Sequence, residues 1–210
     1  MVNDSSEHAF VDAMDVSRET LERLRIYAAT LVKWNSSINL VSKSSLNDLW
    51  SRHFLDSAQL LAVAGTKYSK WVDIGSGAGF PGLVVAIMAH GSGIDAEFVL
   101  IESDGRKAEF LRSVSRETNV PITVLTERIE AATPQSADIL SARALAPLTD
   151  LLAFAEIHLR PGGRALFPKG ATFREEIKIA LEKWAFEGEE CPSKTDASSV
   201  ILSLGDIRRV

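Results

Sequence analysis

The feature that most constrains the fold is a glycine-rich turn between a short strand-like run and a helical segment. The turn Asp73-Ile74-Gly75-Ser76-Gly77-Ala78-Gly79 closes the run at 71–74, and Pro81 opens the segment that follows. Proline suits the first turn of a helix. Glycines let the backbone approach a ligand closely, and a helix N-terminus offers unpaired N–H groups. The sequence therefore predicts a strand, a ligand-binding loop and a helix, in that order.

The same alternation continues to the end of the chain. Further β-rich runs are expected at 97–101, 122–125, 139–142 and 164–167, and helical patterns at 82–90, 106–118 and 148–159. Alternating β and α elements predict a mostly parallel sheet with helices on both faces. Pro161-Gly162-Gly163 predicts a turn before the fifth strand, and Gly205-Asp206 predicts a turn between terminal strands at 200–204 and 207–210.

The first 65 residues show helical periodicity instead. Apolar residues recur at helical spacing over 17–35, behind a Ser17 that can cap the helix, and a second helix is expected from Ser45 with Asp48 in the capping-box position. Residues 1–15 read as a partly ordered lead-in. We therefore predict a helical extension over 1–65 and one Rossmann-like α/β domain over 66–210.

Charge and cysteine content exclude several classes of protein. With 23 Lys and Arg against 28 Asp and Glu, the net charge of -5 excludes a uniformly basic nucleic-acid binder, so any RNA contact needs a local patch. Cys191 is the sole cysteine and lies at no metal-ligand spacing. No apolar run approaches the roughly 20 residues that span a bilayer, and the start lacks the pattern of a secretion signal. We expect a cytoplasmic protein without a metal or a membrane segment, and a monomer.

The glycine-rich turn fits two kinds of cofactor. Gly77-Ala78-Gly79-Phe80-Pro81-Gly82 also matches the dinucleotide pattern, with Glu102 about 20 residues further on. A carboxylate at Asp73 would repel a pyrophosphate, whereas it can hydrogen-bond, directly or through water, to the cationic amino-acid end of S-adenosylmethionine. This favours S-adenosylmethionine. Glu102 is placed to accept hydrogen bonds from ribose hydroxyls with either cofactor.

Polar residues follow each predicted strand. After Asp73 and Glu102 come Arg128-Ile129-Glu130, then Arg143, then Lys169. Ligands of open α/β sheets bind outside the carboxyl ends of the strands, so we expect these residues to converge. His53 lies on an apolar helical stripe, where a histidine is most often a core residue bonded to a neighbour, here Asp56. Alternatively, Arg52, His53 and Asp56 brace the cofactor loop or contact the substrate.

Together these residues resemble the bacterial 16S ribosomal RNA guanine-N7 methyltransferases, the GidB or RsmG family. The resemblance covers about 28–170 and rests on Lys33-Trp34-Asn35 with Ile38-Asn39-Leu40, Arg52-His53-Phe54-Leu55-Asp56-Ser57, the run 73–82, Arg106-Lys107 with Phe110-Leu111, Ala142-Arg143-Ala144 and Pro168-Lys169-Gly170. It implies cofactor contacts at Gly75, Phe80, Ile129, Glu130 and Arg143. Ala142 and Phe80 depart from the family, where many members have serine and some have leucine.

The predicted activity is methyl transfer from S-adenosylmethionine to guanine N7 of 16S ribosomal RNA, as free RNA or in the small ribosomal subunit. Guanine N7 has a free lone pair and no proton to lose, so we expect no general base; Arg143 and Lys169 are the positioning candidates. The expected RNA contacts are Arg52, His53, Lys169 and Arg174, and the expected cofactor contacts are Asp73, Gly75, Gly77, Gly79, Phe80, Glu102, Ile129, Glu130 and Arg143. A nicotinamide-dependent oxidoreductase and a non-catalytic ribosome-assembly factor remain as alternatives.

Overall fold

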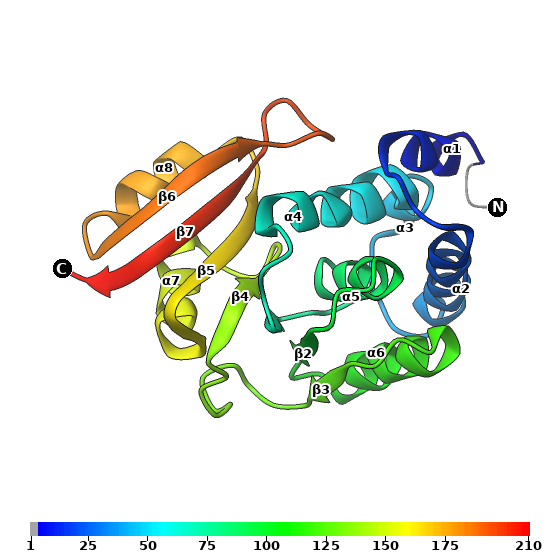
Figure 1. Cartoon of the computed structure of the whole chain (residues 1–210), viewed down its shortest axis with the longest axis horizontal. Helices are drawn as coiled ribbons and strands as arrows, with labels where there is room; N and C mark the ends of the chain where they lie inside the picture. The colour runs from blue at the N-terminus through cyan, green and yellow to red at the C-terminus, as the bar shows by residue number, and fades with distance from the viewer. Residues whose placement is uncertain (1–3) are drawn as a thin grey trace.

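A computed structural model describes residues 4–210, which form a seven-stranded sheet flanked by helices (Figure 1). The strands are β1 (Lys70–Ile74), β2 (Glu97–Ile101), β3 (Thr123–Leu125), β4 (Ala137–Ser141), β5 (Leu159–Lys169), β6 (Trp184–Pro192) and β7 (Val200–Arg209). Their order is β3-β2-β1-β4-β5-β7-β6. The strands from β1 to β5 pair in parallel, while β7 runs antiparallel between β5 and β6. The predicted α/β architecture is confirmed.

The strand order reverses next to β1. The chain moves outward from β1 to β2 and β3, then returns to place β4 on the other side of β1. A crevice at the carboxyl ends of β1 and β4 is therefore the expected ligand site of this topology.

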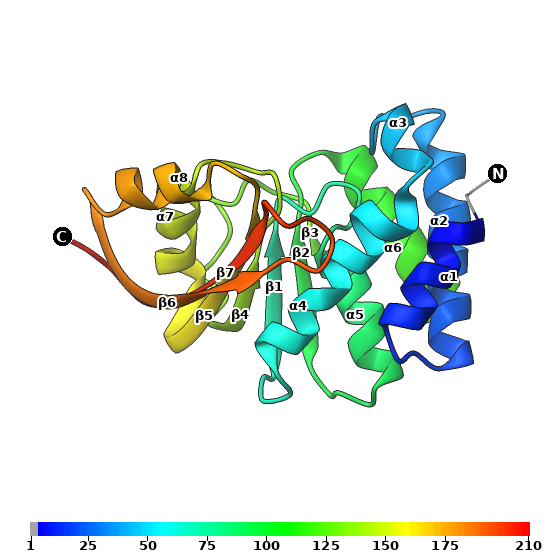
Figure 2. The same ribbon diagram turned by 90° about the horizontal axis from the view of Figure 1, so that it is seen from above.

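Helices cover both faces of the sheet. They are α1 (Asp4–Ala13), α2 (Arg18–Asn35), α3 (Lys43–Leu46), the π-helix η1 (Trp50–Leu55), α4 (Asp56–Ala64), α5 (Gly82–Gly91), α6 (Gly105–Thr118), α7 (Leu148–His158) and α8 (Phe173–Ala180). Successive strand residues face opposite sides: Trp71 joins the core under the N-terminal helices, while Val72 joins the core under α7 and α8. Figure 2 shows these two groups of helices at opposite sides of the strands.

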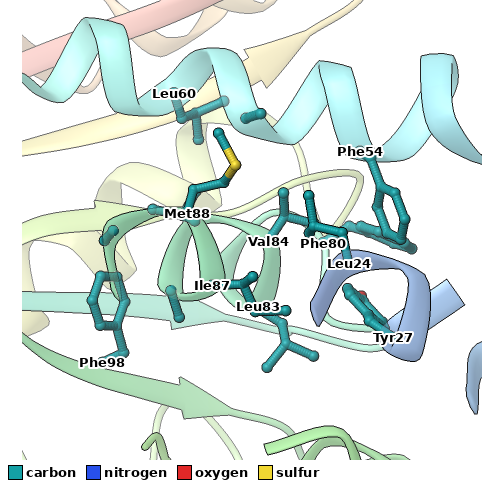
Figure 3. Close-up of a cluster of buried hydrophobic side chains, with 14 of the residues drawn as sticks. Leu24, Tyr27, Phe54, Leu60, Phe80, Leu83, Val84, Ile87, Met88 and Phe98 are labelled. Atoms are coloured by element: carbon teal, nitrogen blue, oxygen red, sulfur yellow. The ribbon is translucent and has the colours of Figure 1, made fainter. Parts of the chain in front are cut away.

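The larger core is centred on α5, whose residues from Gly82 to Ala89 are all buried. Figure 3 shows Leu83, Val84 and Met88 of α5 among Leu60 of α4 and Phe98 of β2. A helix that is apolar all round must be covered on every side. The N-terminal helices provide this cover, so they belong to the same core as the sheet, and the boundary at residue 65 stays a prediction.

Some N-terminal elements differ from expectation. The helix over 17–35 is present as α2, and Ser17 Oγ caps it by accepting a hydrogen bond from Thr20 N at 3.1 Å. The helix expected from Ser45 is instead divided, because Ser42 caps the short α3 and the chain turns before η1. The expected lead-in contains α1, with Phe10 fully buried against Trp50; residues 1–3 of that segment lie outside the described residues.

Two predicted turns in the C-terminal half are wrong. Pro161-Gly162-Gly163 lies within β5 as a register irregularity opposite β4, with Gly162 at φ 75°. Likewise β7 continues through Gly205-Asp206, where Asp206 adopts φ 48°. Both sites are bulges, since a bulge needs the same permissive residues as a turn.

Candidate functional site

A cavity of about 980 Å³ opens at the carboxyl ends of β1, β2 and β4. The glycine loop forms one wall, and the segments that follow β2, β3 and β4 form others. Ser42 and Ser45, which lie between α2 and η1, and His53 of η1 close the remaining side. The cavity therefore lies at the point where the strand order reverses, and its volume suits a cofactor.

Three glycines of the loop adopt positive φ, and a Cβ would meet different surroundings at each of them. A Cβ on Gly75 would lie 2.5 Å from Leu145 Cδ1, and a Cβ on Gly79 would lie 2.6 Å from Tyr27 Oη. At Gly77, with φ 54°, the nearest atom to such a Cβ is Gly75 O at 3.8 Å. Gly75 and Gly77 line the cavity, whereas Gly79 packs against α2 outside it. Gly79 therefore contributes packing, and Gly77 is the one of the three where a Cβ would meet no side chain within 4 Å.

Glu102 connects the end of β2 to the glycine loop. Its Oε2 accepts a hydrogen bond from Gly77 N at 2.8 Å, and its Oε1 accepts one from Asp104 N at 2.8 Å. The residue is buried yet lines the cavity. A carboxylate oxygen has two lone pairs, so Glu102 can accept further hydrogen bonds from a ligand in the cavity.

Asp73 lies beneath the loop and does not line the cavity, contrary to the predicted cofactor contact. Its side chain is fully buried, and its Oδ1 accepts a hydrogen bond from Ser141 Oγ at 2.5 Å. Burial raises the pKa of this carboxyl to about 6, against the hydrogen bonds that lower it. A Cβ on Gly82 would lie 2.5 Å from Asp73 Cβ, so helix α5 starts directly against it. Asp73 thus supports the loop and the helix N-terminus.

Arg143, which follows β4, connects the cavity to the N-terminal helices. Its Nη1 donates to Arg52 O at 3.0 Å and to Asp56 Oδ2 at 3.2 Å, and its Nη2 lies 2.7 Å from His53 Nδ1. Its guanidinium also lies over the Phe80 ring at 5.1 Å. The partner of His53 is therefore Arg143, and the predicted bond between His53 and Asp56 is wrong: both residues bind the same guanidinium.

This contact determines the protonation of His53. A guanidinium only donates, so Nδ1 must accept and the ring proton lies on Nε2. Burial, with the charges of Arg143 and Arg52, lowers the pKa of His53 to about 3. Its ring stacks on Phe80 at 4.7 Å, and its Nε2 has no hydrogen-bond partner within residues 4–210. His53 is a neutral wall of the cavity.

The two predicted cations near the C-terminal end of β5, Lys169 and Arg174, lie in different surroundings. Lys169 lines a second cavity of about 500 Å³, where its Nζ donates to Glu176 Oε2 at 2.7 Å and to Ala146 O at 3.1 Å. Arg174 lines neither cavity and is paired with Glu190 at 3.2 Å on the surface. Only 9% of the Lys169 side chain is exposed, against 72% for Arg174. Lys169 is therefore enclosed, and Arg174 faces solvent.

The first cavity gathers most of the predicted site and some residues that sequence reasoning missed. The predicted residues that line it are Gly75, Gly77, Phe80, Glu102, Ile129, Glu130, Arg143, Arg52 and His53. The missed ones include Lys107, Phe154 and the serines before η1. Lys107 had a signal in the sequence, because it follows Asp104, which caps α6 through bonds to Arg106 N and Lys107 N.

Comparisons with solved structures support the fold. The chain is similar to an O-methyltransferase from Bacillus cereus in complex with SAH, with a TM-score of 0.55, 15% identity, and coverage of 86% of this chain and 90% of that one. A TehB-like SAM-dependent methyltransferase from Corynebacterium glutamicum gives a TM-score of 0.55 at 16% identity, covering 85% and 98%. At these identities the likeness concerns the fold alone.

Sequence comparisons identify the family. The family model described as GidB, rRNA small subunit methyltransferase G, matches residues 20–200. The protein named ribosomal RNA small subunit methyltransferase G from Rhodospirillum centenum is 54% identical over 198 residues, 94% of this chain and 89% of that protein. The protein of the same name from Ruegeria pomeroyi is 50% identical over 199 residues, 95% and 97% of the two chains. The chain belongs to the GidB family of rRNA small subunit methyltransferases G.

Proposed function

We propose that this chain transfers a methyl group from S-adenosylmethionine to N7 of a guanine in 16S ribosomal RNA. The observation that carries the proposal is the hydrogen bond between Gly77 N and Glu102 Oε2, within a cavity at the strand reversal. It places a carboxylate acceptor for ribose hydroxyls beside a glycine loop that leaves room for a ligand. Family membership supports the ribosomal RNA substrate.

The cavity fits the parts of this cofactor. Glu102 would hold the ribose, and Ile129 would contact the adenine beside Glu130. Gly75 and Gly77 would meet the amino-acid end, where Asp73 acts through the loop that it supports. Phe80 and Arg143 would border the methyl end.

The chemistry requires alignment. S-adenosylmethionine supplies a methyl group on a cationic sulfur. Guanine N7 attacks with a lone pair that carries no proton, so the protein has to hold the base in line and exclude water. His53, neutral and packed on Phe80, fits a wall for this purpose, and Arg143 holds that wall in place through its bonds to η1. No metal is needed for this reaction.

The RNA is proposed to approach over η1 and the loop between β6 and β7. Arg52 and Lys194 are exposed and line a third cavity of about 490 Å³ beside that loop. With a net charge of -5, the chain has to attract phosphates through such a local group of cations. Arg174 remains a predicted contact further out. We propose a cytoplasmic monomer.

The test is methyl transfer with purified protein. Small ribosomal subunits and free 16S RNA would be incubated with S-adenosylmethionine labelled on its methyl group, and the RNA then digested to nucleosides. We expect the label in N7-methylguanosine. Cofactor binding without transfer would indicate an assembly factor, and calorimetric binding of NAD in place of S-adenosylmethionine would indicate an oxidoreductase; either result would overturn the proposal.

A further inference from the structure

The second cavity adjoins the first. Arg143, Ala144, Leu145 and Ala146 line both, so this short segment after β4 forms their common wall. Ala144 adopts φ 53° there, a bend that places Leu145 against Gly75. With a volume of about 500 Å³, the second cavity has room for a nucleobase. A base in it would lie next to a cofactor in the first cavity.

The enclosed ion pair in this cavity has unused hydrogen-bonding capacity. The Lys169 ammonium has three N–H donors, and two of them are taken by Glu176 Oε2 and Ala146 O. Glu176 Oε2 also accepts from Leu148 N at 2.9 Å. Its other oxygen, Oε1, accepts no hydrogen bond from residues 4–210. Lys169 and Glu176 both line this cavity, so one unused N–H donor and one unused carboxylate oxygen belong to neighbouring residues of its lining.

We infer that Lys169 and Glu176 select guanine: Lys169 donates to O6, and Glu176 Oε1 accepts from N1–H and the 2-amino group. This inference rests on the proposed function, and it names the base-reading residues of that site. Guanine presents O6, N1–H and the 2-amino group in a row. Hydrogen bonds to charged partners are the stronger kind, so an ion pair reads this edge effectively.

Other bases match the pair less well. Adenine has a donor where guanine has O6 and an acceptor where guanine has N1–H, so both contacts would be repulsive. Cytosine likewise has a donor, its 4-amino group, at the first position and an acceptor, N3, at the second. Uracil satisfies the first two positions but turns a carbonyl oxygen toward Glu176 at the third. Only guanine satisfies all three.

The orientation also fits transfer to N7. Lys169 Nζ is bonded to the carbonyl of Ala146, which lies in the common wall. The O6 side of the base would therefore lie next to that wall. N7 is the ring atom beyond O6, on the side away from N1–H, so it would face the first cavity.

The test measures binding of GMP and IMP, which differ only by the 2-amino group, to protein saturated with S-adenosylhomocysteine so that the first cavity is occupied. Ligand-observed NMR reads affinities in the millimolar range. We expect wild-type protein to prefer GMP over IMP by about tenfold, the value of one good hydrogen bond. AMP, with the same phosphate, should bind more weakly than either.

Substitutions separate reading of the base from a structural role. In Glu176→Gln the amide oxygen should face Leu148 N and Lys169, which turns the NH₂ group toward the base; the preference for GMP over IMP should then fall to about one. Lys169→Met should weaken both nucleotides equally and keep their ratio. Glu175→Gln, an exposed neighbour on α8, should change nothing. Unchanged S-adenosylhomocysteine affinity would show that each variant folds.

The inference fails if GMP does not bind, or if wild type and Glu176→Gln show the same ratio of GMP to IMP affinity. Methyl transfer by the same wild-type preparation separates this failure from failure of the proposed function. If the label appears in N7-methylguanosine but Glu176→Gln leaves the ratio of GMP to IMP affinity unaltered, Lys169 and Glu176 do not read the base, and the proposed activity still holds.

Discussion

A side chain is excluded at each glycine of the loop for a different steric reason. Gly77 gives the cleanest test of the cofactor site. Gly77→Val adds a side chain at a cavity wall where nothing else is displaced. We expect S-adenosylmethionine affinity, measured by calorimetry, to fall at least about tenfold. Gly93→Val is the control, since Gly93 has φ 71° and open surroundings outside the cavity. Equal affinity losses in the two variants would attribute the effect to backbone strain.

Glu102 should contribute directly to cofactor affinity. Glu102→Ala removes the proposed ribose acceptor and leaves Gly77 N without its partner, so binding should weaken by about 1 to 3 kcal/mol. Calorimetry would measure it. The matched control is Glu97→Ala, at the exposed start of the same strand, which should bind normally. Wild-type affinity in Glu102→Ala would move the ribose site elsewhere.

His53 should stay neutral through the physiological range. Its pKa of about 3 lies below the unfolded value of about 6.5, so only the unfolded chain gains a proton as the pH falls between them. The neutral ring therefore favours folding above about pH 6.5, and this contribution is lost on acidification toward pH 3. Two-dimensional ¹H–¹⁵N NMR should show an Nε2–H tautomer without titration between about pH 5 and pH 8. A midpoint near 6.5 would contradict the contact with Arg143.

The sequence predicts which residues follow the strands, but it does not predict which side chains pack around those residues. Glu102 and Arg143 were found because parallel strands end at one edge. The burial of Asp73 was missed because nothing in the sequence shows that Ser141 and Gly82 close over it. Glu176 had no signal, since an acidic residue on an exposed, polar helix is usually a solvated one.

At the scale of elements, the close approach of α2 and α5 joins the N-terminal helices to the sheet. A Cβ on Gly91 would lie 1.9 Å from Thr20 Oγ1, and Thr20 itself is buried. Gly91→Ala should lower the free energy of unfolding by about 1 to 3 kcal/mol through overpacking. Gly105→Ala, at the start of α6 with nothing near its Cβ, is the control and should be neutral or slightly stabilising. Urea unfolding would measure both, and equal stabilities would mean that α2 is not packed there.

Elements with a strong apolar period were predictable, and polar ones were not. The strands β1, β2 and β4 are buried on both faces, so each contains consecutive apolar residues. By contrast, β6 at the sheet edge carries exposed Glu187, Glu189 and Glu190. Charges protect an edge strand from pairing with other chains, and they also hide it from a search for apolar patterns.

At the scale of the whole molecule, the cavity at the glycine loop, the second cavity proposed for the nucleobase and the loop proposed to face RNA adjoin one another. The loop at 193–199 is held against α4, where Gln59 Oε1 accepts from Lys194 N at 2.9 Å and Asp56 Oδ1 accepts from Thr195 Oγ1 at 2.9 Å. Asp56 also binds Arg143. No helix within the described residues is long and apolar enough to cross a membrane. The α/β order was predictable from the sequence, but this junction of distant segments was not, because it depends on side-chain contacts between them.

The most direct test of the proposed activity is the N7-methylguanosine content of 16S ribosomal RNA from cells with and without this protein. Mass spectrometry of fragments would count the modified guanines. We expect N7-methylation at one position to disappear without the protein, and to return when the wild-type chain is supplied but not when Glu102→Ala or Gly77→Val is. An unchanged set of N7-methylguanines in cells lacking the protein would contradict it.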